Sequence, residues 1–145
     1  MWWVAIQTKP IVGSAANNSI LGMRGDDTLL GGSGDDKLSG GAGEDRLSGG
    51  IGADILSGGK GADVFLFAEG EGLDTLNKFN WHEGDQIDLT AFELSDDSAI
   101  RSETLKRGHM LQVNVEGTWE DVVHLVSAVD FTSVDALIDE GALLF

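Results

Sequence analysis

The chain has 145 residues, about the size of one domain, and its 25 acidic against 9 basic side chains give a formal net charge of −16. This balance argues against nucleic acid and anionic membrane surfaces as partners, and it fits a protein that binds cations. The 21 glycines would indicate disorder if they followed no period, and the absence of cysteine excludes disulfides and zinc–thiolate sites.

Residues 1–21 form a lead-in of mixed character. The apolar run Trp2–Ile6 is shorter than the ~7 residues of a minimal signal-peptide core, and no segment reaches the ~18 apolar residues of a membrane helix. Gly13–Leu21 is a faint version of the repeat that follows, with Asn18 in the place of its aspartate. Terminal units of repeat arrays are usually atypical, so we expect a degenerate capping repeat here.

Residues 22–66 repeat a nine-residue pattern, clearest in the stretch GGSGDDKLSGGAGEDRLSGGIGADILSGGKGADVFL, although Met23 replaces one glycine in the first unit. The aspartate position is held by Asp27, Asp36, Asp45, Asp54 and Asp63. The apolar position is held by Leu29, Leu38, Leu47, Leu56 and Phe65. Nine is not a helical period, and each glycine would destabilise a helix by roughly 1 kcal/mol. We therefore predict a six-residue turn and a three-residue strand in each unit.

The pattern of glycine and aspartate favours binding of a hard cation. Glycine adopts backbone conformations closed to other residues, so a glycine-rich turn can direct several carbonyl oxygens to one point. Calcium takes six to eight oxygen ligands, which carbonyls of two stacked turns and one aspartate from each would supply. The candidate sites are the five aspartates, Asn18, and the turns at Gly25, Gly32, Gly34, Gly41, Gly43, Gly50, Gly52, Gly59 and Gly61. A flexible linker would have no reason to keep leucine and aspartate in register.

The tandem pattern GGxGxDxLx resembles the RTX family of secreted calcium-binding proteins. The resemblance implies an all-β fold, a right-handed parallel β-roll in which each nonapeptide is half a coil and units two apart stack. It would pair Asp27 with Asp45, Asp36 with Asp54, Asp45 with Asp63 and, more weakly, Asn18 with Asp36. We expect about four calcium ions at affinities of ~10⁻⁴–10⁻³ M. Since one inward side chain per strand makes a thin core, we expect the repeats to fold only on binding calcium.

Residues 67–145 lose the glycine period and form a predicted capping region of mixed β structure with a short helix. Gly61–Phe92 resembles the segment that closes the β-roll in serralysin-type proteases and in the R-modules of alginate epimerases. This resemblance implies that Asp74, Asp85 or Asp88 binds a final calcium ion, although turn and strand-end carboxylates are an equal alternative. Met110–Phe131 predicts a β-hairpin that turns at Gly117 and covers the open end of the roll.

The tail TSVDALIDEGALLF predicts a short helix that starts at Thr132 or Ser133, followed by an apolar end. Acidic residues before a few terminal apolar residues resemble the uncleaved signal of type I secretion substrates. The resemblance implies an extracellular protein whose partner during export is an ABC-transporter machinery. A terminal strand within the sheet is compatible with this interpretation.

The sequence predicts a non-catalytic module. The three histidines form no HExxH motif, and neither GxSxG nor a P-loop is present. We expect a monomeric module that folds in calcium outside the cell and helps to export and fold a larger protein. One alternative is a polysaccharide-binding module for an alginate-like polymer, with Trp81 and Trp119 as stacking candidates. Another is an adhesin or self-association module that uses the outward residues Leu30, Ile55, Val64 and Leu66.

Overall fold

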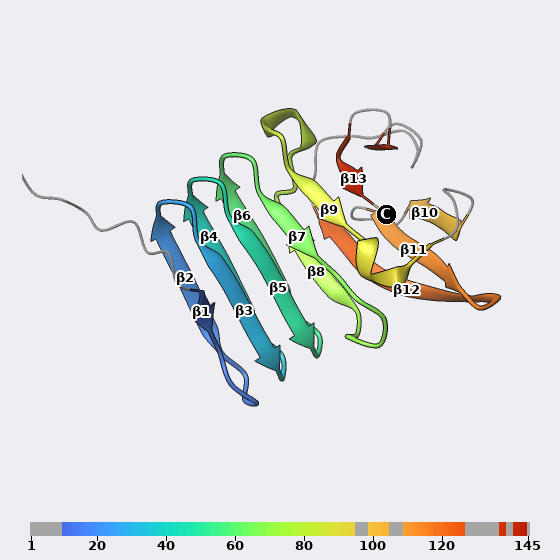
Figure 1. Ribbon diagram of the computed structural model, residues 1–145, viewed down its shortest axis with the longest axis horizontal. Coiled ribbons are helices and arrows are strands. Elements are labelled where there is room, and N and C mark those ends of the chain that lie inside the picture. The colour runs from blue at the N-terminus through green and yellow to red at the C-terminus, as the bar shows by residue number, and fades with distance from the viewer. Residues whose placement is uncertain (1–9, 95–98, 105–108, 127–136, 139–140, 145) are drawn as a thin grey trace, which may run out of the picture.

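The computed structural model describes residues 10–94, 99–104, 109–126, 137–138 and 141–144, which form two facing β-sheets with almost no helix (Figure 1). The first sheet has the strand order β1 (Ile11–Val12), β3 (Thr28–Ser33), β5 (Arg46–Ile51), β7 (Val64–Leu66), β9 (Gln86–Asp88) and β13 (Leu143–Leu144). The second has the order β10 (Ile100–Thr104), β11 (His109–Val115), β12 (Thr118–Val126), β8 (Asp74–Asn77), β6 (Ile55–Lys60), β4 (Lys37–Ala42) and β2 (Ser19–Arg24). None of the helices among these residues is long and apolar enough to cross a membrane.

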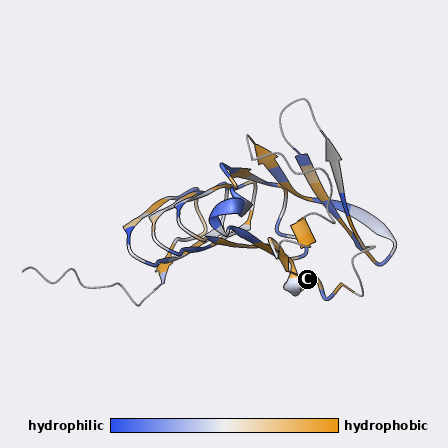
Figure 2. Ribbon diagram, turned by 90° about the horizontal axis from the view of Figure 1, so that it is seen from above, coloured by the Kyte–Doolittle hydropathy of each residue, from blue (hydrophilic) through white to orange (hydrophobic). Residues whose placement is uncertain are grey.

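Strands β1 to β9 alternate between the two sheets, so the chain winds as a parallel β-roll, as the sequence predicts. Within the repeat, each strand pairs with the strand one coil later, as in the parallel pairs Leu29 with Leu47 and Leu38 with Leu56. The ladders begin at Ile11, inside the region predicted as a lead-in, and continue beyond residue 66 through β8 and β9. Figure 2 shows the stacked coils, with the C-terminal strands at one end of them.

The strands of the repeat are longer than predicted. Strands β3 to β6 have six residues each, not three, because the glycine pair also joins the parallel ladder. Gly32 pairs with Gly50 in this way, and both have positive φ, 111° and 89°. A Cβ on Gly50 would lie 2.2 Å from the carbonyl oxygen of Gly32, so only glycine allows the two coils to stack this closely.

The core is thin in the repeat and thicker beyond it. Leu29, Leu47 and Phe65 line the first sheet and Leu38 and Leu56 the second, and each is at most 2% exposed. The expected single layer of inward side chains therefore holds for the repeat. Past Phe65, the same core continues and adds more buried residues, including Phe67, Phe79, Leu89, Leu111, Val113, Val123 and Leu125. The repeat and the C-terminal end thus share one continuous apolar core, and sequence reasoning did not predict how far it thickens beyond the repeat.

The predicted hairpin is formed by β11 and β12, and its turn lies at Glu116 and Gly117, which both have positive φ. Strand β12 also pairs in parallel with β8, so the hairpin extends the second sheet at the end of the roll. A register shift after Leu111 breaks the alternation, and Val122 and Val123 are both buried.

The described part of the tail packs against the first sheet. The terminal strand β13 pairs in parallel with β9, as the strand interpretation of the tail predicts. Leu137 and Ile138 have helical backbone, while the predicted helix start at Thr132 or Ser133 lies outside the described residues.

We predict that Met23→Gly stabilises the protein. Met23 pairs with Gly41, holds the position of a repeat glycine and has φ 83°, a conformation that is strained for methionine. Glycine removes the strain, and we expect the free energy of unfolding in saturating calcium to rise by up to about 1 kcal/mol. The control Leu21→Gly, on the same strand without positive φ, should instead lose stability. Denaturant titration measures both, and a less stable Met23→Gly would contradict the assignment.

Candidate metal centre

The aspartates of the repeat form two ladders at the edges of the roll. Ladder I contains Asn18, Asp36, Asp54 and Asp74, at the turns that lead from the first sheet to the second. Ladder II contains Asp27, Asp45, Asp63 and Asp85, at the turns that lead back. The neighbours expected from the resemblance therefore lie next to one another, and Asp74 and Asp85 continue the two ladders beyond the repeat.

Each rung of a ladder is a hydrogen bond from the backbone to a carboxylate. The backbone N–H of Asp27 donates to Oδ1 of Asp45 at 2.8 Å, and that of Asp36 donates to Oδ1 of Asp54 at 2.7 Å. The same bond joins Asp45 to Asp63 and Asp54 to Asp74, both at 2.9 Å, Asp63 to Asp85 at 3.1 Å, and Asn18 to Asp36 at 2.6 Å. In each rung, one oxygen of the accepting carboxylate thus holds the preceding coil in place.

The second carboxylate oxygen is buried without a partner at all five aspartate positions of the repeat. Among the described residues, Oδ2 has no hydrogen-bond partner in Asp27, Asp36, Asp45, Asp54 and Asp63. This oxygen fills the place of a glycine side chain, because a Cβ on Gly40 would lie 2.2 Å from Oδ2 of Asp45. A buried polar atom without a partner is costly, so these oxygens fit a ligand that is a cation.

The predicted glycines lie in the turns and strand ends beside the ladders. At all of them except Gly25, a Cβ would come within 3.0 Å of an atom of the preceding coil. At Gly52 and Gly61 this atom is the carbonyl oxygen of Gly34 and of Gly43, respectively. The glycines therefore allow carbonyl oxygens of neighbouring turns to stack beside the carboxylates, which is the mixed oxygen environment that calcium prefers.

The pKa values of the ladder carboxylates also favour a cation bound beside them. Burial raises the pKa of Asp63 to about 6 and that of Asp74 to about 7, and it raises the pKa of Asp45, Asp54 and Asp85 as well. Neighbouring carboxylates raise these pKa values further, whereas the backbone hydrogen bonds lower them. Without a counterion, these carboxylates are hard to ionise in the folded chain.

Asp85 and Asp88 have different roles at the end of the roll. Asp85 accepts hydrogen bonds on both oxygens, from the N–H groups of Asp63 and Asn80, and so closes ladder II. Asp88 lies outside both ladders, and its Oδ1 accepts from the backbone N–H and the hydroxyl of Thr90, at 3.0 and 2.6 Å. The structure thus places Asp88 as a turn carboxylate.

Sequence reasoning missed one acidic residue beside ladder I, Glu71. The run Gly70–Asp74 keeps the GxGxD phase of the repeat, but the coil from Asp54 to Asp74 spans 20 residues where earlier coils span 18. A Cβ on Gly72 would lie 2.1 Å from the carbonyl oxygen of Gly52, so this turn stacks like the earlier ones. The GxGxD spacing of Gly70–Asp74 is the sequence signal that could have identified this turn. The two extra residues of the coil hid it.

Within the described part of the chain, no three His, Cys, Asp or Glu side chains gather as a metal site. A cation between two rungs would therefore depend on one or two carboxylates and on backbone carbonyls. Calcium accepts this combination readily, whereas metals that prefer nitrogen or sulfur ligands do not.

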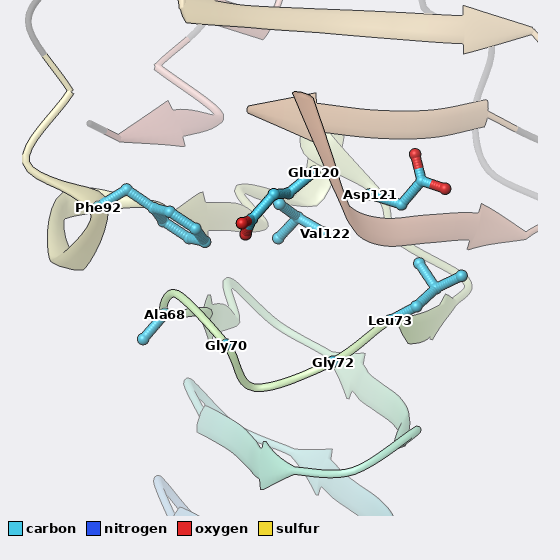
Figure 3. A pocket seen from close by; sticks show the side chains of 8 residues that line it. All are labelled: Ala68, Gly70, Gly72, Leu73, Phe92, Glu120, Asp121 and Val122. Carbon is cyan, nitrogen blue, oxygen red and sulfur yellow. The ribbon is translucent and has the colours of Figure 1, made fainter. Parts of the chain in front are cut away.

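The cavities outside the ladders, among the described residues, include two that differ in charge. One, of about 390 Å³, opens between the loop 68–73 and β12, and Figure 3 shows Glu120 directed towards Phe92 while Asp121 points away. The other, of about 430 Å³, lies over strands β2, β4 and β6 and is lined by residues that include Lys37, Ser39, Ile55 and Ser57. The wall of the first cavity combines apolar side chains with the acidic Glu120 and Asp121, whereas the wall of the second includes the basic side chain of Lys37.

Comparison with known proteins agrees with this geometry. The family model described as the RTX calcium-binding nonapeptide repeat, in four copies, matches residues 11–38, 30–65 and 39–76. No curated protein sequence matches the chain.

Two solved structures resemble nearly the whole chain. The AlgE6R3 subunit of the mannuronan C5-epimerase from Azotobacter vinelandii is 26% identical, with a TM-score of 0.67 over 99% of this chain and 86% of that one. The AlgE6R2 subunit of the same enzyme is 24% identical and shares the fold, with a TM-score of 0.69 over 96% of this chain and 94% of that one. Residues 11–76 of the chain therefore match the repeats of the RTX calcium-binding nonapeptide type.

Proposed function

We propose that this chain is a non-catalytic, extracellular module whose β-roll folds when calcium fills the two ladders. The observation that carries the proposal is the row of buried Oδ2 atoms that have no partner among the described residues. Five of the rungs each join a different pair of aspartates. We therefore propose about five ions, where the sequence alone indicates about four. Each ion would be held by the paired carboxylates and by carbonyl oxygens of the stacked turns.

Calcium binding and folding are coupled because the roll has little else to hold it together. Each strand of the repeat contributes one inward side chain, and many glycines must be ordered on folding. The ionised ladders also repel one another across neighbouring coils. Bound calcium supplies positive charge between the coils, so the binding free energy becomes folding free energy.

This coupling suits a protein that leaves the cell through a narrow channel. A chain that meets little calcium in the cytosol stays extended, and it folds after it reaches calcium outside. We propose that the apolar C-terminal end is the uncleaved signal for type I export by an ABC transporter. In the folded chain, Leu143 and Leu144 pair with β9. This pairing supports a signal that is accessible to the transporter only while the chain is unfolded. The module would export and help to fold a larger protein.

We predict that Asp45→Ala impairs folding more than Asp27→Ala. Asp45 takes part in two described rungs, with Asp27 and with Asp63, whereas Asp27 takes part in one. In a calcium titration followed by far-UV circular dichroism, both variants should need more calcium, and Asp45→Ala the most. Equal midpoints would contradict the pairing. An unmodified chain that is already folded in excess chelator at neutral pH would contradict the proposed function itself.

Acid should partly replace calcium. The pKa values of Asp63 and Asp74 are raised in the folded state, so the unfolded chain releases its protons at lower pH than the folded chain. Stability is then greatest below about pH 4 and falls as the pH rises through about 6 and 7. In chelator, strand content should be higher at pH 5 than at pH 8, and Asp74→Asn should reduce the difference. Equal strand content at both pH values would contradict this account.

A second candidate function is the binding of an acidic polysaccharide. The solved neighbours are subunits of a mannuronan C5-epimerase, and the groove over β2, β4 and β6 presents Lys37 with Ser39 and Ser57. A basic side chain among hydroxyl groups suits a uronic acid polymer. The cavity beside Glu120 suits it poorly because its wall carries negative charge.

Calorimetry with alginate oligomers in saturating calcium tests this candidate. Binding in the groove predicts that Lys37→Ala weakens the affinity, while Lys60→Ala, at an exposed lysine outside the groove, leaves it unchanged. If the unmodified chain gives no heat of binding, this second function is rejected and the calcium-dependent module stands alone.

A further inference from the structure

We propose that Asn17, Asp26 and Asp35 are positioning residues that orient glycine carbonyl oxygens towards the cations of the two ladders. Each of the three directly precedes a ladder residue in the sequence. None of them belongs to a ladder, and they act on the cation only through the backbone of the following coil. The inference rests on the proposed calcium-binding function and explains how its carbonyl ligands are held.

Each of these three side chains accepts a backbone N–H from the coil that follows. Oδ1 of Asn17 accepts the N–H of Asp35 at 3.0 Å, and Oδ1 of Asp26 accepts that of Glu44 at 2.9 Å. Oδ1 of Asp35 in turn accepts the N–H of Ala53 at 3.1 Å. These bonds, which we call the outer clips, run opposite to the ladder rungs, in which an aspartate accepts an N–H from the coil before it. Clips and rungs together hold the turns from both sides.

An outer clip fixes the direction of a carbonyl oxygen as well as that of an amide. In a planar trans peptide, the N–H of one residue and the C=O of the residue before it point in opposite directions. Since the N–H of Glu44 points to the coil before it, the C=O of Gly43 points to the coil after it. A Cβ on Gly61, in that following coil, would lie 2.1 Å from this carbonyl oxygen. The clip from Asp26 therefore directs the oxygen of Gly43 to the next coil.

The same relation holds at the other two clips. The N–H of Asp35 is clipped, and the carbonyl oxygen of Gly34 would lie 2.2 Å from a Cβ on Gly52. The N–H of Ala53 is clipped, and the carbonyl oxygen of Gly52 would lie 2.1 Å from a Cβ on Gly72. In all three cases the carbonyl oxygen is directed to the gap between two coils, where the proposed function places a cation.

The other repeat units show what the role requires. Glu44 holds the same place in its unit, but within the described residues its longer side chain accepts no N–H from the next coil. Ala53 and Ala62 hold this place in the last two units and have no side-chain acceptor. Asn17 forms its clip with a neutral amide oxygen. The role therefore requires a short side chain with an acceptor, and it does not require a charge.

Substitution of Asp35 separates positioning from charge. Asp35→Asn keeps the acceptor and removes the charge, whereas Asp35→Ala removes both, and Glu44→Ala removes a charge at a place without a clip. In calcium calorimetry, we expect Asp35→Ala to weaken one class of site about fivefold, the size of one lost hydrogen bond. We expect Asp35→Asn and Glu44→Ala to change the affinity less than about twofold, because an exposed charge is well screened. Far-UV circular dichroism in saturating calcium verifies that all the chains fold.

The number of water molecules on the bound ion is a readout that general destabilisation would not move. Terbium(III) replaces calcium, and its luminescence lifetimes in H2O and D2O count the waters that it binds. A carbonyl oxygen that turns away leaves a place for water, so Asp35→Ala should add about one water at one site. Asp35→Asn and Glu44→Ala should add none. Hydrogen exchange at the Ala53 amide verifies that the clip is lost in Asp35→Ala and kept in Asp35→Asn.

Two results would overturn the inference. One is an Asp35→Ala chain that binds calcium with the affinity and hydration of the unmodified protein. The other is an Asp35→Asn chain as weak as Asp35→Ala, because the charge would then be responsible. If the unmodified chain neither binds calcium nor folds with it, the proposed function fails first, which is a distinct result.

Discussion

The structure depends on carboxylates that are stacked and buried at intervals of one coil. Asp36, Asp45, Asp54 and Asp63 each use one oxygen to accept a backbone N–H of the coil before, and each turns the other oxygen into the space that a glycine leaves free. The first interaction fixes the register of the coils, and the second creates a site that protein groups do not satisfy. A row of like charges in a poorly solvated edge is unstable unless protons or cations compensate it.

This constraint explains why the nine-residue pattern is so regular. A side chain at Gly40 or Gly49 would collide with the carboxylate of its own unit, and a side chain at Gly50 or Gly59 would collide with the coil before it. The inward leucines fill the narrow space between the sheets, where one large residue per strand suffices. Glycine therefore allows the close approach of the coils, aspartate joins neighbouring coils, and leucine fills the space between the sheets.

The repeat could be predicted from the sequence because its geometry is local and periodic. Constant spacing of Asp45, Asp54 and Asp63 is enough to indicate which coils stack, once each unit is taken as half a coil. The longer coils that end at Asp74 and Asp85 break the period, which concealed Glu71 as a member of a repeat-like turn.

The C-terminal half was less predictable because its pairings join distant parts of the chain. Alternation of apolar residues indicates the β11–β12 hairpin, but nothing in either strand shows that β12 pairs with β8. The strand lengths were underestimated because backbone pairing at the glycines leaves no apolar pattern. The core around Phe79 and Leu125 similarly depends on tertiary packing.

Hydrogen exchange at the ladder amides tests the central claim most directly. The amides of Asp27, Asp36, Asp45, Asp54 and Asp63 donate to the next aspartate in the stack, so they exchange only when the coils separate. At neutral pH, we predict strong protection of these five amides in millimolar calcium and loss of protection in chelator. Equal protection in both conditions would show that the roll is held together without a cation and would contradict the account.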